Sequence, residues 1–214
     1  MPRITAIERR RFKRRADIWL DGERAFSLSL ELIAASGLTP GRELSAAEAS
    51  ELREMDERQQ AMEGALHLLS RGPRSERELR LRLRRRGLGR PAVDAAVERV
   101  RELGYLDDGD FARAYVETRQ ATAPRSRRHL AFELGRRGIS KEVAAGAVED
   151  VSDEDAAYQA AQQRLRALRN LDRRAFERRL GTFLTSRGFS YGVARAVIDR
   201  CWQDISAAGA EPEV

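Results

Sequence analysis

An internal repeat constrains the fold of this sequence more than any other feature. Three glycines, Gly87, Gly138 and Gly188, stand 51 and 50 residues apart, and an arginine precedes each of them. Hydrophobic residues recur at five fixed distances from these glycines, at positions −8, −4, +1, +10 and +13. They are Leu79, Leu83, Leu88, Val97 and Val100 in the first copy, Leu130, Leu134, Ile139, Val148 and Val151 in the second, and Leu180, Leu184, Phe189, Ile198 and Cys201 in the third. A pattern that occurs three times predicts units stacked in tandem, because one small unit buries its hydrophobic face poorly alone.

The spacing inside each copy predicts two helices that meet at the glycine. Leucines four residues apart lie on one face of a helix. A glycine just beyond the helix adopts the left-handed conformation that a Schellman cap requires, and an arginine in the last turn complements the helix dipole. A further helix is expected before each pair, near residues 56–70, 108–121 and 153–169. Each repeat is therefore expected to contain three helices.

The segment before residue 45 has a different pattern, which predicts β-structure. Asp21-Gly22 is a strong signal for a two-residue hairpin, and hydrophobic and polar residues alternate on both sides of it. We expect strands near residues 4–10, 14–20 and 23–29 and a short helix near residues 30–36. Ser45 and Glu48 then form a capping-box pattern, which predicts a helix that runs to about Leu69.

These patterns together predict a mainly α-helical protein, a tandem array of three three-helix repeats with a small N-terminal β-hairpin or β-rich segment. The expected parts are the β-rich segment 1–44, the first repeat with its leading helix 45–106, the second repeat 107–151, the third repeat 152–206, and a disordered acidic tail 207–214.

Charge is distributed unevenly along the chain. The 214 residues carry a formal net charge of +6, and only two of the 40 basic residues are lysines, Lys13 and Lys141. Residues 71–90 carry a net charge of +7 and residues 1–15 carry +6, whereas residues 146–163 carry −5. Arginine-rich segments are typical of surfaces that bind phosphates or carboxylates. Aromatic residues make up only 6% of the chain, which argues against a large aromatic-lined cofactor pocket.

No catalytic constellation is evident in the sequence. The single cysteine, Cys201, excludes an internal disulfide, and its place in a hydrophobic column predicts a core residue. His67 and His129 lack a paired nucleophile motif, and the aspartates of residues 107–110 are interpreted as a helix cap rather than a calcium loop. We therefore expect no enzyme activity, no cofactor and no metal. Without an apolar run of about 18 residues or a secretory signal, the expected location is the cytoplasm.

Arginines on the outer faces of the predicted helices are the remaining functional signal. At about 100° per residue they point away from the leucine stripe, so they can contact phosphates or acidic side chains of a partner. The partner-binding candidates are Arg77, Arg80, Arg84, Arg85, Arg128, Arg136 and Arg178. The alternative interpretation is a solvated helix face. Three-helix units with basic helices also resemble helix-turn-helix proteins, but an array of three unlike copies favours an extended surface for a large polymer.

The chain resembles the RecX family of regulatory proteins, which modulate the RecA recombinase. The matching residues are Arg74-Ser75-Glu76-Arg77-Glu78-Leu79, Arg86-Gly87, Gly104-Tyr105-Leu106-Asp107-Asp108, Phe111-Ala112, Tyr115-Val116, Arg137-Gly138-Ile139 and Arg187-Gly188-Phe189-Ser190. The near absence of lysine and the charged segment 45–60 depart from the family pattern.

The resemblance implies three tandem three-helix repeats and no enzymatic activity. It also implies a protein that binds the RecA–DNA filament, lies along its groove, and inhibits filament growth, ATP hydrolysis and strand exchange in DNA repair, DNA recombination and the SOS response. We expect a monomer without membrane association. Direct contact with single- or double-stranded DNA inside the filament stays open, and the alternative function is that of an autonomous basic nucleic-acid-binding protein.

Overall fold

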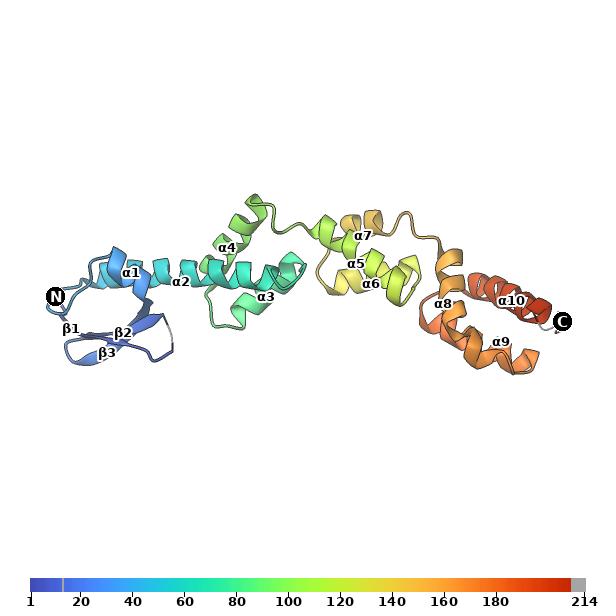
Figure 1. Ribbon diagram of the computed structural model, residues 1–214. Coiled ribbons are helices and arrows are strands. Elements are labelled where there is room, and N and C mark those ends of the chain that lie inside the picture. Colours follow the sequence, from blue (N-terminus) through green and yellow to red (C-terminus); the bar gives the residue numbers. More distant parts are fainter. Residues whose placement is uncertain (13, 209–214) are drawn as a thin grey trace. The chain divides into compact units, whose positions relative to one another are not determined.

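The computed structural model describes residues 1–12 and 14–208, in which ten helices and one three-stranded sheet are found (Figure 1). The described chain forms two compact units. The first unit holds residues 1–73 and 78–106, and the second holds residues 74–77 and the described chain from Asp107 onward. The expected mainly helical architecture with a small N-terminal sheet is confirmed.

An antiparallel sheet with the order β1-β2-β3 opens the first unit. Its strands are β1 (Ile4–Arg9), β2 (Arg15–Leu20) and β3 (Glu23–Ser29), and α1 (Leu30–Ala35) follows β3 directly. Asp21 and Gly22 both have positive φ angles, 49° and 88°, as the predicted two-residue hairpin requires. The buried face of the sheet contributes Ile4, Ile18 and Leu28 to the N-terminal core. The three strands and the short helix predicted from the sequence are thus confirmed.

One long helix, α2 (Ala46–Leu69), takes part in two cores of the first unit. The predicted capping box starts it: the Ser45 N–H donates to the Glu48 carboxylate at 2.9 Å, and the Glu48 N–H donates to the Ser45 hydroxyl at 3.1 Å. Near its start, Leu52 packs into the core of the sheet. Near its end, Leu68 packs with α3 (Glu76–Arg84) and α4 (Arg90–Glu102), and these three helices form the first repeat.

The second unit contains the helices of the other two repeats. The second repeat consists of α5 (Asp108–Thr122), α6 (Arg127–Arg136) and α7 (Lys141–Ala147). The third repeat consists of α8 (Asp153–Leu168), α9 (Arg173–Ser186) and α10 (Tyr191–Ala208). Because α10 extends to Ala208, the helix continues beyond the expected end of the third repeat at residue 206. The remainder of the predicted disordered tail, residues 209–214, lies outside the described residues.

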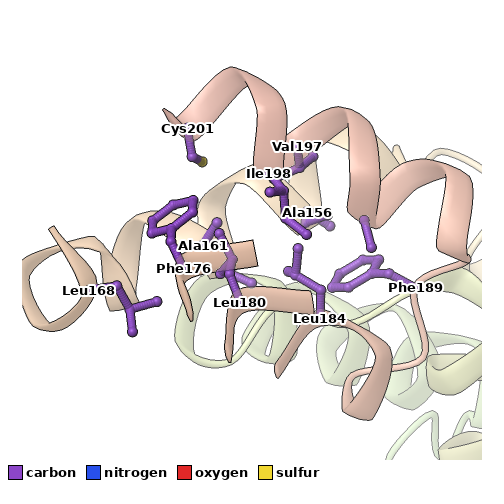
Figure 2. Close-up of a cluster of buried hydrophobic side chains, with 13 residues drawn as sticks. Ala156, Ala161, Leu168, Phe176, Leu180, Leu184, Phe189, Val197, Ile198 and Cys201 are labelled. Atoms are coloured by element: carbon purple, nitrogen blue, oxygen red, sulfur yellow. The ribbon is translucent and has the colours of Figure 1, made fainter. Parts of the chain in front are cut away.

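The repeated hydrophobic columns form the cores of the three repeats. The leucines at −8 and −4 are completely buried in every copy. In the third repeat Leu180 and Leu184 lie beneath Ile198 and Phe189, and Phe176 fills the space near Cys201 (Figure 2). The three anchor glycines have φ angles of +85°, +92° and +88°, so the predicted left-handed caps are confirmed.

The buried thiol of Cys201 allows a test of this core. Burial raises its pKa to about 11, so only about one thiol in a thousand is ionised at pH 8 and the thiolate that attacks disulfide reagents is scarce. We expect the native protein to react negligibly with a chromogenic disulfide reagent at pH 8, and one thiol per chain to react after denaturation. A Ser206→Cys variant on the exposed side of the same helix provides the control, because its added thiol should react at once. Rapid reaction of native Cys201 would contradict this core.

Among the helices of the described chain, none combines the length and the hydrophobicity needed to cross a lipid bilayer.

Candidate partner-binding surface

Six of the seven candidate arginines are exposed. These are Arg77, Arg84, Arg85, Arg128, Arg136 and Arg178. The seventh, Arg80, is partly buried, and its Nε lies 3.2 Å from Oδ1 of Asp94 on the neighbouring helix α4. The outward orientation predicted from helix geometry therefore holds for six side chains, and their role in binding stays a prediction.

In the first unit, the surface of α3 is basic and partly apolar. Arg84, the last residue of α3, and Arg85, just beyond it, are exposed, and neither takes part in an ion pair with any residue that the structure describes. Leu81 lies on the same helix with 48% of its surface exposed. These side chains offer two guanidinium groups beside an apolar group, a combination that suits a partner with acidic and apolar groups.

In the second unit, α6 repeats this combination. Arg128 and Arg136 are exposed, and Phe132 lies between them in sequence with 61% of its surface exposed. Phe132 and Leu81 occupy the same repeat position, six residues before the anchor glycine. Exposed aromatic residues next to arginines are typical of binding hot spots. The sequence analysis missed both residues, although a large hydrophobic residue outside the leucine stripe was a usable signal.

In the third repeat, the corresponding surface between α9 and α10 carries carboxylates as well as arginines. Arg178 lines a groove of about 400 Å³ between α9 and α10, and Tyr191 at its edge is 74% exposed. Arg173 at the same groove is paired with Glu177 at 2.8 Å and with Asp199 at 3.2 Å. The carboxylates of Glu177 and Asp199 thus offset part of the positive charge of the arginines that line this groove.

Arg77 differs from the other candidates because its aliphatic stem is packed. It belongs to the short segment 74–77 of the second unit, and its Cδ and Cβ would lie 2.4 Å and 2.5 Å from a Cβ atom placed on Gly138. The side chain of Arg77 thus combines packing against a backbone with an exposed charged end.

A network of charged side chains surrounds Glu133 in the second repeat. The hydroxyl of Tyr115 donates to the Glu133 carboxylate at 2.7 Å, and Nε of Arg119 lies 3.2 Å from it. Nε2 of His129 lies 2.9 Å from Arg125 and 3.6 Å from the carboxylate. Burial, followed by the charge of Arg125, lowers the pKa of His129 and so favours the neutral imidazole. His129, which lacks a paired nucleophile motif in the sequence, therefore has structural partners.

The other residues considered for chemistry also have structural explanations. Asp107 caps α5, because its Oδ1 accepts the Asp110 N–H at 2.8 Å, which confirms the predicted cap. His67 is exposed on α2. Within residues 1–12 and 14–208, no group of three or more histidine, cysteine, aspartate or glutamate side chains is arranged to hold a metal ion.

Comparison with known proteins identifies the family. Three family models match separate segments in order: the first three-helix domain of RecX at residues 61–99, the second at 107–148 and the third at 152–198. The regulatory protein RecX of Listeria welshimeri is 28% identical over 198 residues, which cover 91% of this chain and 74% of that protein. A crystal structure of regulatory protein RecX superposes with a TM-score of 0.64 at 25% identity, over 93% of this chain and 100% of that chain.

A crystal structure of RecX from Lactobacillus salivarius has the same fold, with a TM-score of 0.60 at 20% identity over 69% of this chain and 97% of that chain. The three matched segments coincide with the three repeats whose cores and glycine caps are described above, and together they cover more than half of the sequence. On these grounds, this chain belongs to the RecX family of regulatory proteins.

Proposed function

We propose that this protein binds the filament that the RecA recombinase forms on DNA and inhibits its growth, its ATP hydrolysis and its strand exchange. The observation that carries the proposal is the repeated three-helix unit, which presents exposed arginines in each copy. A filament is itself a repeating polymer, and tandem repeat proteins use extended surfaces to bind such partners. The protein is expected to act as a cytoplasmic monomer without a cofactor.

The contacts are expected to be charge-assisted. Exposed guanidinium groups such as those of Arg84, Arg85 and Arg128 form two parallel hydrogen bonds with a carboxylate or a phosphate. Leu81 and Phe132 add apolar area next to them, which favours acidic and apolar side chains of a protein partner over phosphates alone. Inhibition of this kind requires no catalytic activity of the regulator, because a protein bound to the surface of the filament is sufficient to block the activity of RecA.

A direct test adds the purified protein in substoichiometric amounts to RecA on single-stranded DNA. We expect slower DNA-dependent ATP hydrolysis and shorter filaments in electron micrographs. Unchanged hydrolysis together with unchanged filament length would exclude the proposed function.

A second candidate function is autonomous binding of nucleic acid, which the basic segments 1–15 and 71–90 favour. For duplex DNA, each phosphate neutralised adds about 0.9 to the slope of log affinity against log salt concentration. We expect weak binding in the absence of RecA, because aromatic residues for base stacking are scarce. Tight binding with a steep salt dependence, measured by fluorescence anisotropy, would favour this second function.

A further inference from the structure

Equivalent backbone carbonyl groups accept a hydrogen bond from equivalent serines at two places in the second unit, once from a hydroxyl and once from a backbone N–H. Ser75 and Ser126 each stand twelve residues before an anchor glycine, and both are buried. The hydroxyl of Ser75 donates to the carbonyl oxygen of Arg137 at 2.6 Å. The N–H of Ser126 donates to the carbonyl oxygen of Arg187 at 3.3 Å. Each serine at the start of a helix thus contacts the Arg-Gly pair that ends the second helix of the following repeat.

An aspartate adds a second contact at both places. The N–H of Glu76 donates to Oδ1 of Asp108 at 2.8 Å, and the N–H of Arg127 donates to Oδ1 of Asp153 at 2.7 Å. Asp108 and Asp153 are the first residues of α5 and α8, which are the first helices of the second and third repeats. The carboxylates satisfy N–H groups at helix starts, which have no partner within their own helix.

The anchor glycines allow this close approach. A Cβ atom on Gly188 would lie 2.6 Å from Oγ of Ser126 and 2.8 Å from Cβ of His129, which is too close for any side chain. Gly138 is similarly close to Arg77, whereas Gly87 has nothing within 4 Å of such a Cβ atom. All three glycines need a positive φ angle, so Gly138 and Gly188 have a second role that Gly87 lacks.

The side chain of Arg187 contacts Pro124, two residues before Ser126. Its Nη1 donates to the carbonyl oxygen of Pro124 at 3.0 Å, and its guanidinium lies 4.5 Å from the centre of the Phe183 ring. Burial and three neighbouring arginines lower the pKa of Arg187. No carboxylate of the described residues pairs with it, so the carbonyl and the aromatic ring are its main stabilising contacts.

We propose that Arg187 and Gly188, together with Ser126 and Asp153, are positioning residues that lock the third repeat onto the second in one orientation. The fixed orientation aligns the exposed arginines of the two repeats for the filament, and this part rests on the proposed function. Without the lock, only a fraction of the molecules has the binding-competent arrangement, and the apparent affinity falls by that fraction.

The test compares Gly188→Ala with Gly87→Ala. The φ angles at the two positions are +88° and +85°, so the alanines share the backbone strain, but only the first collides with a neighbouring repeat. Spin labels on Glu117→Cys and Gln203→Cys, both exposed, report the distance between the second and third repeats, and the buried Cys201 stays unlabelled. We expect a broad distance distribution for Gly188→Ala and an unchanged one for Gly87→Ala.

Inhibition of RecA ATP hydrolysis is measured on the same proteins without labels. Gly188→Ala is expected to need about tenfold more protein for half-inhibition, as when about a tenth of the molecules is competent, and Gly87→Ala is expected to stay within about twofold. Arg187→Met provides an independent variant, because it keeps an unbranched side chain at this position and removes both the donor to Pro124 and the cation over the Phe183 ring. Its control is Arg174→Met, which removes an exposed charge from the same helix.

The outcomes separate the lock from the proposed function. A narrow distance distribution in both Gly188→Ala and Arg187→Met, with circular dichroism unchanged, would refute the lock. A broad distribution with wild-type inhibition would refute the positioning role. If the wild-type protein itself does not inhibit RecA, the proposed function and the positioning role both fail, while the distance measurement still decides whether the lock exists.

Discussion

Replacing Asp56 with alanine is expected to destabilise the first unit by about 3–5 kcal/mol, because it breaks a buried ion pair and leaves one charge without its partner. Asp56 is 3% exposed. Its carboxylate accepts hydrogen bonds from Arg15 at 2.7 and 3.2 Å, from the Ser29 N–H at 2.8 Å, and from Gln60 at 2.7 Å. These donors come from the sheet and from α2, so the single carboxylate joins β2, the end of β3 and the long helix.

The change is measured by urea denaturation with tryptophan fluorescence. The chain has two tryptophans, Trp19 in β2 of the first unit and Trp202 in α10 of the second, so a Trp202→Phe background makes the signal specific for the first unit. The matched control is Glu31→Ala, which breaks an exposed ion pair with Arg14 and should change the free energy of unfolding by no more than about 1 kcal/mol. Equal effects of the two substitutions would contradict the role assigned to Asp56.

The repeat architecture was predictable because its signals are local. Leucines such as Leu130 and Leu134 recur at helical spacing, and a glycine follows the helix at a fixed distance, so the sequence alone indicates helix, cap and buried face. The role of Asp56 was not predictable in this way. Its partners lie 41 and 27 residues away for Arg15 and Ser29, and no periodicity distinguishes a buried aspartate from an exposed one on α2.

The anchor glycines show a second property of the fold that sequence patterns do not predict. Gly87 and Gly188 look equivalent in the sequence and have nearly equal φ angles. They differ in what approaches them, because Ser126 and His129 lie against Gly188 and nothing lies against Gly87. This difference arises from the contact between neighbouring repeats. It cannot be predicted from the sequence pattern within one repeat.

For the candidate site, the sequence likewise predicts which side chains are exposed but not which contacts they make with other elements. Helix geometry places Arg84 and Arg128 on exposed faces, as observed. It does not show that Arg80 is paired with Asp94, because that pair depends on how α4 packs beside α3. It also does not show that the stem of Arg77 packs against Gly138. These two residues are therefore poor choices for a test of binding, since changing them also disturbs the fold.

Reversing the charge of Arg84 and Arg128 together is expected to weaken inhibition of RecA by about 100-fold, if each loses one charge-assisted contact that contributes about tenfold. Both side chains are exposed, and neither has an ion pair among the described residues, so Arg84→Glu and Arg128→Glu should leave folding intact. The measurement is the protein concentration that halves the rate of RecA ATP hydrolysis at constant salt, with circular dichroism to monitor the helices.

Two controls separate a lost contact from a lost fold or a changed net charge. Arg166→Glu with Arg174→Glu makes the same change in net charge at exposed arginines outside the candidate set, and it should inhibit nearly as well as the wild type. Leu79→Ala truncates a completely buried leucine and should lose activity through instability, because such changes cost about 2–5 kcal/mol. If the Arg84 and Arg128 double reversal stays helical and still inhibits RecA at the wild-type concentration, these arginines form only a solvated face, and the contact with the filament lies elsewhere on the repeats.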